Sequence, residues 1–324
     1  MALTAAAVNT HPSSSATAEL PEFSARTRLL VIAPHPDDET IANGLLIQRV
    51  RAAGGEVKIL LLTAGENNPW PQRWLERRVF IGSADRRRWG QRRHVELGHA
   101  LEQLDVPARA LQTLDWPDMG VTDILLRDGP RALATMADAI TAFRPSLVAM
   151  PSIDDRHPDH GSAYVLARLA LAEQADVPLQ LAYLIHGHAT DEHFIEMAGM
   201  PEQLANKLAA LNAHHSQMAL SGPRMRRLAG RAECYSRVLA MPHPSRNALP
   251  WQPWAWLRPW LRLSVFDRSS VQSWRWSQAP LQRGRDGTYY LAPSVDGGAG
   301  PRFARLACAL PSLWIFDHWG WREL

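Results

Sequence analysis

The chain has 324 residues, of which 46% are hydrophobic and 21% charged, and its formal net charge is +3. This composition is typical of a globular protein, and the length suits one large domain with an appendage. Only two cysteines are present, Cys234 and Cys308, which excludes a disulfide framework and a cysteine-based zinc site and favours a reducing, cytoplasmic location.

Residues 1–26 are rich in Ala, Ser and Thr and lack a basic start followed by an apolar core. We expect a disordered arm here and not a signal peptide. The first regular element is a strand at Leu29–Ala33, followed by an amphipathic helix at Thr40–Ala53 that Gly54-Gly55 ends. A second strand, rich in leucine and β-branched residues, is expected at Val57–Thr63.

A long insertion follows at residues 66–90, and insertions of this length in a compact domain are usually lids or binding segments. Beyond it, strands and helices alternate. Helices are expected at 91–104, 130–143, 158–174 and 201–213, and strands at 110–114, 146–150 and 179–185. The alternation predicts an α/β fold with a Rossmann-like, mostly parallel, doubly wound sheet, whose active site lies beyond the carboxyl ends of the strands.

The strongest chemical signal is the segment Val31–Thr40, an apolar run that ends in one histidine and three consecutive acids. Adjacent carboxylates repel each other unless a cation lies between them, and a divalent metal is the simplest such cation. His35 and Asp38 can both turn toward a metal where the chain leaves the strand. Asp37 lies between them, in the position expected of a general base.

A second motif follows the apolar run Leu147–Pro151 and contains two histidines three residues apart, His157 and His160. Pro158 suits the first turn of a helix, so the two histidines share one helix face. One can bind a metal while the other reaches toward substrate. Two strand ends that each carry histidine and aspartate can converge at one sheet edge and form a catalytic zinc site with an open position.

In these motifs the chain resembles the zinc-dependent N-deacetylases of the LmbE/PIG-L family, which carry an AHPDDE-like loop and a later HxxH pair. The resemblance covers residues 27–235. It is carried by Ala33–Glu39, Leu60–Glu66, Arg92–Glu96, Leu114–Asp118, His157–His160 and Ser216-Gln217. The chain departs from the family at Asp155 and Arg156, where members acting on thiol-precursor glycosides can carry a tyrosine.

The resemblance implies zinc, or another divalent metal, bound by His35, Asp38 and His160. It implies that Asp37 is the general base and that His157 stabilises the charged intermediate, which an imidazolium would do. The implied activity removes the acetyl group from an N-acetylated amino sugar of the N-acetylglucosamine type. The sugar would belong to a glycoside, a glycolipid or a lipopolysaccharide precursor.

The other polar residues carry weaker signals, and most of them have two interpretations. Glu96 and Asp118 can be ordinary caps or ion pairs, or they can support the metal ligands. Glu39 is interpreted as an acid at a helix N-terminus. His186, His188 and His193 are interpreted as strand-end or surface residues, with pocket lining as the alternative.

The part after the deacetylase-like region, residues 236–324, has a different composition. From residue 223 onward there are fifteen arginines and six acids, and nine of the thirteen tryptophans lie after residue 250. One interpretation is an aromatic-rich cap packed on the catalytic domain; the other is a surface that contacts an anionic membrane or glycolipid peripherally. Nucleic-acid binding is disfavoured because no recognised module accompanies the arginines. Residues 271–277 and 288–292 are expected to be antiparallel strands.

Two other functions stay open at the level of sequence. A metal-dependent hydrolase of another bond, such as a phosphoester, would be favoured by a paired-metal site, whereas only one ligand triad is visible. A non-catalytic, Arg/Trp-rich protein that binds membranes or glycolipids would not need the intact Asp37-Asp38 pair.

Overall fold

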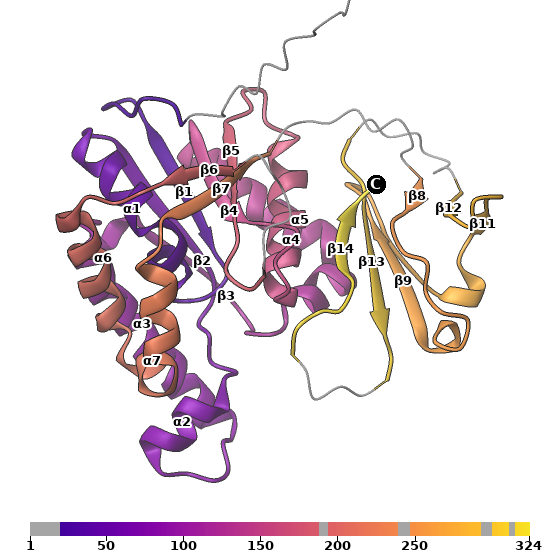
Figure 1. Cartoon of the computed structure of the whole chain (residues 1–324), viewed down its shortest axis with the longest axis horizontal. Helices are drawn as coiled ribbons and strands as arrows, with labels where there is room; N and C mark the ends of the chain where they lie inside the picture. Colours follow the sequence, from indigo (N-terminus) through magenta and orange to yellow (C-terminus); the bar gives the residue numbers. More distant parts are fainter. Residues whose placement is uncertain (1–19, 188–193, 239–246, 293–299, 311–314) are drawn as a thin grey trace, which may run out of the picture.

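The computed structural model describes residues 20–187, 194–238, 247–292, 300–310 and 315–324. An α/β part and a smaller, C-terminal β part lie side by side (Figure 1). Residues 1–19 of the predicted arm lie outside the described residues. The rest of that arm is in contact with the fold, because Leu20 and Phe23 pack against the apolar core.

A seven-stranded sheet forms the centre of the α/β part, in the order β3-β2-β1-β4-β5-β7-β6. The first five strands in this order are parallel, and β7 and β6 are antiparallel additions at one edge. The strands are β1 (Arg28–Ala33), β2 (Glu56–Thr63), β3 (Leu111–Trp116), β4 (Leu147–Pro151), β5 (Leu179–Tyr183), β6 (Phe194–Met197) and β7 (Glu233–Arg237). The predicted mostly parallel sheet is confirmed.

Helices cover both faces of this sheet. Alternate residues of β1 point to opposite sides: Leu29 and Val31 join one core cluster, and Leu30 and Ile32 join the other. This is why the strand is an unbroken apolar run in the sequence. One face carries α1 (Asp38–Ala52), α3 (Ser83–Gln103), α6 (Pro201–Ala213) and α7 (His215–Ala229); the other carries α4 (Val121–Phe143) and α5 (Pro158–Leu171).

The strand order reverses between β1 and β4, because α1 follows β1 on one face and α5 follows β4 on the other. Such a reversal opens a crevice beyond the carboxyl ends of the two strands, where ligands bind in open α/β sheets. Both polar motifs begin at these two strand ends.

Several helices differ from the sequence predictions. The insertion at 66–90 contains α2 (Pro69–Glu76), and α3 begins at Ser83 and not near residue 91. Helix α4 begins nine residues before Pro130; its backbone leaves the helical region at Asp128, which accommodates the proline. Helix α7 was not predicted, and it contains Pro223.

The C-terminal part consists of two antiparallel sheets in the orders β10-β9-β13-β14 and β11-β12-β8. The predicted strands at 271–277 and 288–292 are present as β10 and β12, one in each sheet. The strands are β8 (Ala248–Leu249), β9 (Leu261–Phe266), β10 (Val271–Arg275), β11 (Leu281–Arg283), β12 (Tyr289–Leu291), β13 (Phe303–Cys308) and β14 (Gly320–Glu323).

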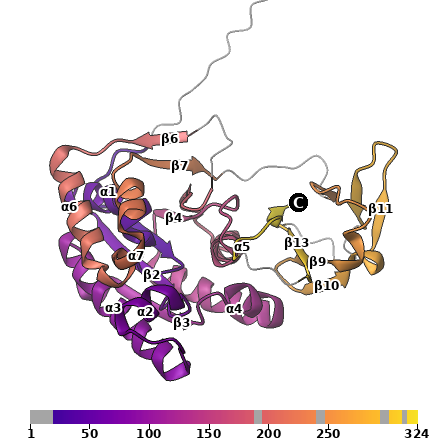
Figure 2. The same ribbon diagram turned by 60° about the horizontal axis from the view of Figure 1, so that its bottom comes forward.

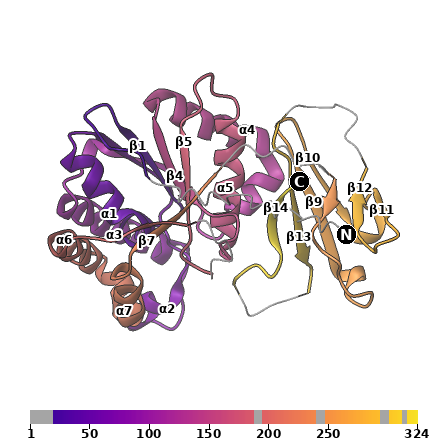
Figure 3. The same cartoon turned by 45° about the horizontal axis from the view of Figure 1, so that its top comes forward.

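This C-terminal part is packed on α4 and α5 (Figures 2 and 3). Phe266, Phe303 and Trp321 are fully buried and belong to the same apolar cluster as residues of α4 and α5. The indole N–H of Trp321 donates to the Ser162 hydroxyl at 3.0 Å. The two parts therefore share one core. In the part of the chain that the structure describes, no helix is long and apolar enough to cross a membrane.

We predict that Trp321→Ala lowers the free energy of unfolding by about 3–5 kcal/mol, because it leaves a cavity between β14 and α5 and removes the hydrogen bond from the indole to Ser162. Trp256→Ala is the matched control, since that side chain is 65% exposed and its loss should cost less than about 0.5 kcal/mol. Urea unfolding would measure both. Equal stability of the two variants would contradict the shared core.

Candidate active site

The ends of β1 and β4 bring the two predicted motifs together. His35, Asp37 and Asp38 lie between β1 and the first turn of α1, and His157 and His160 lie at the start of α5. All five side chains are buried. Pro158 occupies the first turn of α5, as predicted, so His157 and His160 approach the end of β1 from the same side.

Three side-chain atoms form a nearly equilateral triangle at the centre of the site. His35 Nδ1 lies 3.3 Å from Asp38 Oδ2 and 3.3 Å from His160 Nε2, and the last two atoms are 3.2 Å apart. Tetrahedral ligands at the usual zinc–nitrogen and zinc–oxygen bond lengths are about 3.3–3.6 Å from one another. The arrangement therefore fits a tetrahedral metal with three protein ligands and one open position.

The far side of each histidine faces a second carboxylate. His35 Nε2 lies 3.2 Å from Asp118 Oδ1, and His160 Nδ1 lies 3.1 Å from Asp155 Oδ2. Asp155 is itself held in place, because it accepts hydrogen bonds from the backbone N–H groups of His157, Ile185 and His186. Such carboxylates commonly orient metal-binding histidines.

Other groupings of histidine and acid are also close enough to share a cation. They are His35, His157 and His160; Asp155, His160 and His186; and His35, Asp118 and Asp159. The carboxylates of the last two groups face the ring nitrogens of His35 and His160 that point away from the triangle. Asp159 also accepts hydrogen bonds from the backbone N–H groups of Met119 and Val121. These carboxylates are therefore placed to orient the two histidines.

The site has a strong excess of buried negative charge. Burial by itself would lower the pKa of His160, but the carboxylates of Asp155 and Asp38 outweigh it and raise the pKa to about 10. Burial would likewise raise the pKa of Asp38, yet His160 and His35 hold it well below its usual value. The surroundings therefore stabilise positive charge at the centre of the triangle.

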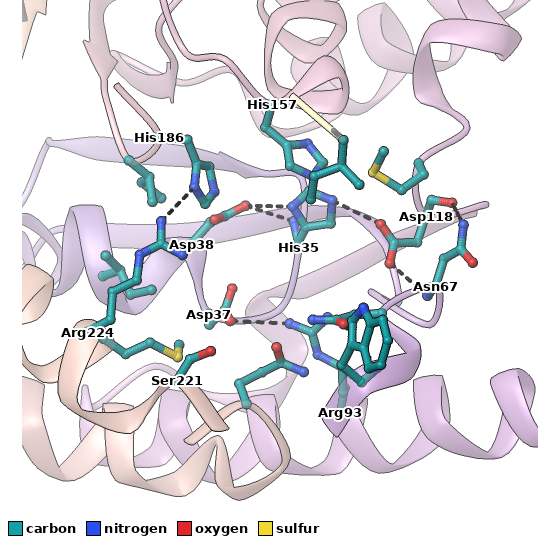
Figure 4. A pocket seen from close by; sticks show the side chains of 18 of the residues that line it. His35, Asp37, Asp38, Asn67, Arg93, Asp118, His157, His186, Ser221 and Arg224 are labelled. Atoms are coloured by element: carbon teal, nitrogen blue, oxygen red, sulfur yellow. Dashed lines mark hydrogen bonds and ion pairs between the residues drawn. The ribbon is translucent and has the colours of Figure 1, made fainter. Parts of the chain in front are cut away.

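Asp37 lies beside the triangle and faces Arg93 of α3, whose guanidinium is 3.3 Å from Asp37 Oδ2 (Figure 4). Arg93 also donates to the backbone carbonyls of Pro36 and Gly65. Burial raises the pKa of Asp37 to about 6, although Arg93 acts in the opposite direction. A carboxylate with this pKa is suited to accept a proton near neutral pH.

The backbone of Asp37 is in a conformation that non-glycine residues rarely adopt, with φ at 123°. Its N–H donates to the Glu39 carboxylate at 2.9 Å, and Glu39 in turn lies 3.2 Å from His214. Glu39 is thus an acid in the first turn of α1, as predicted, and it also holds the backbone of Asp37 in this strained form.

His157 caps the N-terminus of α5: its Nδ1 accepts a hydrogen bond from the backbone N–H of Asp159 at 3.3 Å. A ring that accepts at Nδ1 carries its proton on Nε2 and is neutral. Burial, reinforced by His35 and His160, lowers the pKa of His157 to about 2. The expected imidazolium is therefore not supported, and His157 is placed as a neutral N–H donor.

A pocket of about 290 Å³ opens above these residues. One wall comes from the start of α2 and another from α7. A third comes from Ile315 and Phe316 of the C-terminal part. His186 lines the pocket with its Nδ1 3.3 Å from an Arg224 guanidinium nitrogen, so the pocket-lining alternative holds for this histidine (Figure 4). His188 and His193 lie outside the described residues.

Comparisons with known proteins agree with this geometry. The PIG-L family, described as GlcNAc-PI de-N-acetylase, matches residues 30–171. This range contains all five predicted site residues. Over this region the resemblance to the LmbE/PIG-L family that the motifs predicted is confirmed.

One relative is a 1D-myo-inositol 2-acetamido-2-deoxy-alpha-D-glucopyranoside deacetylase of Nocardia farcinica, which is 32% identical over 165 residues. The match covers 46% of this chain and about half, 53%, of that relative.

Two solved structures share the fold. The N,N'-diacetylchitobiose deacetylase from Pyrococcus horikoshii aligns with a TM-score of 0.52 and 18% identity, over 67% of this chain and 88% of that one. The zinc-inhibited form of teicoplanin deacetylase Orf2 aligns with a TM-score of 0.52 and 18% identity, over 66% of this chain and all of that one.

Two of the motifs that carry the family resemblance, Arg92–Glu96 and Ser216-Gln217, contact each other. The Glu96 carboxylate accepts the backbone N–H and the hydroxyl of Ser216, and so caps the start of α7. Gln217, the next residue, lines the pocket. Sequence reasoning left Glu96 and Asp118 ambiguous; the structure makes Glu96 a helix cap and places Asp118 against His35.

The orienting roles of Asp155 and Asp159 were missed. Both residues stand within the second histidine motif, and a local signal was present: aspartates two residues before His157 and one residue before His160. The sequence does not show which backbone N–H groups donate hydrogen bonds to these carboxylates, because those groups come from distant loops.

Gly65 provides a test of the Arg93 contact, because the Arg93 guanidinium occupies the space that a Cβ at this position would need, and φ is +64°. We predict that Gly65→Ala destabilises the protein by at least about 1 kcal/mol and displaces Arg93 from Asp37. Gly98→Ala is the matched control: nothing lies within 4 Å of its Cβ, so the helix should gain up to about 1 kcal/mol. Thermal unfolding measures both; a neutral Gly65→Ala would contradict the described contact.

Proposed function

We propose that this protein is a zinc-dependent hydrolase that removes the acetyl group from an N-acetylated amino sugar of the N-acetylglucosamine type. The sugar would be part of a glycoside, a glycolipid or a lipopolysaccharide precursor. The observation that carries the proposal is the triangle of His35, Asp38 and His160 with Asp37 beside it, at the floor of a pocket. The similar proteins described above are deacetylases of N-acetylated sugars, which supports the same reaction class.

His35 Nδ1, Asp38 Oδ2 and His160 Nε2 would hold the zinc ion. When bound there, zinc would act as a Lewis acid toward the amide carbonyl and would lower the pKa of the attacking water. Asp118 and Asp155 would fix the orientation of the two histidines. The ligand set contains no sulfur, which also suits other divalent metals.

Asp37 would accept the proton of the water that attacks the amide carbon and would then deliver a proton to the departing sugar amine. Arg93 holds this carboxylate from one side, at 3.3 Å, so its orientation is set before substrate binds. The neutral N–H of His157 would donate to the carbonyl oxygen as negative charge develops on it. The products are acetate and the free amino sugar.

The two alternatives are less well supported. Phosphoester hydrolysis by paired metals would need a second ligand set, and the carboxylates around the triangle are already engaged by backbone N–H groups and histidines. A purely binding role would not account for the strained backbone of Asp37, which sets this carboxylate beside the ligand atoms.

Metal analysis separates ligands from base. We predict that His35→Ala, Asp38→Ala and His160→Ala lose most of the roughly one zinc per chain that the triangle accommodates. Asp37→Asn should keep its zinc, because Asp37 is not a corner of the triangle. Full zinc content in all three ligand variants would contradict the assignment, and circular dichroism serves as the control for folding.

Acetate release tests the reaction itself. We predict that the zinc-loaded protein releases acetate from at least one member of a panel of N-acetylglucosamine glycosides, glycolipids and oligosaccharides. Asp37→Asn should lower kcat by on the order of 10²–10⁴, the usual contribution of a general base, with zinc retained. Release of phosphate instead of acetate, or full activity of Asp37→Asn, would overturn the proposal.

A further inference from the structure

The segment of residues 69–88, here called the α2 hairpin, comprises α2, the turn after it and the start of α3. It extends away from the sheet, at the lower end of the molecule in Figure 1, and α2 remains at this outer end in Figure 2. The mechanism uses none of its outer side chains.

The α2 hairpin exposes an unusual amount of apolar surface. Trp70 and Trp74 are each 67% exposed, Val79 is 73% exposed and Phe80 is 87% exposed, and Leu75 between them is also exposed. Single exposed apolar residues are common on soluble proteins, whereas a contiguous group marks a surface that contacts a partner or a membrane. Here five such side chains lie within eleven residues.

The same hairpin is basic. It contains six arginines and only two acids, Glu76 and Asp85. Arg88 forms ion pairs with both acids, and Arg78 forms one with Asp85. Three further arginines of the hairpin are exposed and have no ion-pair partner among the described residues: Arg77, Arg86 and Arg87. Exposed aromatic side chains beside unpaired arginines match the headgroup region of an anionic bilayer, where rings insert and guanidinium groups pair with phosphates.

The α2 hairpin adjoins the mouth of the pocket. Its first two residues, Pro69 and Trp70, line the pocket. Ile315, which is 57% exposed, lies on another wall of the pocket. A surface bound by the hairpin would therefore lie close to the opening through which substrate enters.

We propose that the α2 hairpin docks the protein on an anionic lipid bilayer and presents the pocket to N-acetylated sugars carried by lipids at that surface. Docking rests on the hairpin alone; the substrate class rests in addition on the proposed function. The sequence suggested the Arg/Trp-rich C-terminal part as the membrane-contacting surface. That part also exposes Trp254 and Trp256, but neither residue lines the pocket.

Vesicle sedimentation tests the docking. The full-length protein should pellet with vesicles of equal parts phosphatidylglycerol and phosphatidylcholine, bind much less to phosphatidylcholine alone, and be released by high salt. Trp74→Ala/Phe80→Ala and Arg86→Glu/Arg87→Glu should each lower the partition coefficient by on the order of 10-fold or more. None of these residues lines the pocket, and thermal unfolding should confirm that the variants fold.

The matched control is Trp254→Ala/Trp256→Ala, which removes two equally exposed tryptophans from the C-terminal part and should leave binding unchanged. If this control loses binding while the hairpin variants keep it, the C-terminal part is the docking surface and the proposal is wrong. Wild-type protein that stays in the supernatant at low salt also overturns it. The proposal is also wrong if the wild-type protein is a dimer in solution and Trp74→Ala/Phe80→Ala makes it a monomer, because the hairpin would then bind a second copy of the chain.

Activity measurements keep the two proposals apart. With a water-soluble N-acetylglucosamine glycoside, the hairpin variants should release acetate at the wild-type rate, whereas with a lipid-linked N-acetylglucosamine in vesicles their rate should fall about as much as their binding. Absence of acetate release from wild type would overturn the proposed function and leave the binding result to decide the docking. Equal rates of variants and wild type on vesicles would overturn the docking.

Discussion

The burial of five carboxylates around the ends of β1 and β4 constrains the whole site. The residues are Asp37, Asp38, Asp118, Asp155 and Asp159. Isolated buried carboxylates are costly, so each must be neutralised or accept hydrogen bonds. Backbone N–H groups satisfy Asp155 and Asp159, histidines face Asp38 and Asp118, and Arg93 faces Asp37. A divalent cation at the centre of the triangle would complete this balance, and the reversal of strand order provides the place for it.

The site and the pocket are built from different parts of the chain. The charged floor comes from two strand ends that the core holds rigidly, whereas the walls come from α2, α7 and the C-terminal part. In the proposed reaction the floor would act on the amide group, which all N-acetylated sugars share, and would not distinguish one sugar from another. Substrate choice should therefore depend on wall residues such as Trp70, Arg224 and Phe316, which lie outside the sequence motifs. The C-terminal part matters here because it shares a core with α4 and α5 and is held against the site.

The strands and the metal-binding motifs were predictable because their signals are local: apolar runs, histidine and aspartate in fixed order, and a proline at a helix start. The mostly parallel, doubly wound sheet followed from the alternation of strands and helices, whereas the antiparallel strands β6 and β7 were not predicted. The wall formed by α7 and the first part of α4 were not predictable, because Pro223 within α7 and Pro130 within α4 usually mark helix boundaries, and tertiary packing overrides them here. The neutral state of His157 could not be predicted from the sequence either, because it depends on a hydrogen bond that the ring accepts from the backbone N–H of Asp159.

The central claim is that two histidine nitrogens and one carboxylate oxygen bind zinc where β1 and β4 end. X-ray absorption at the zinc edge of the zinc-loaded protein tests it most directly. The account predicts nitrogen and oxygen neighbours at about 2.0–2.2 Å, no sulfur, and the outer-shell scattering of two imidazole rings. In the His160→Ala protein, any residual zinc signal should show the scattering of fewer imidazole rings. A sulfur neighbour, or a spectrum that His160→Ala leaves unchanged, would contradict the account.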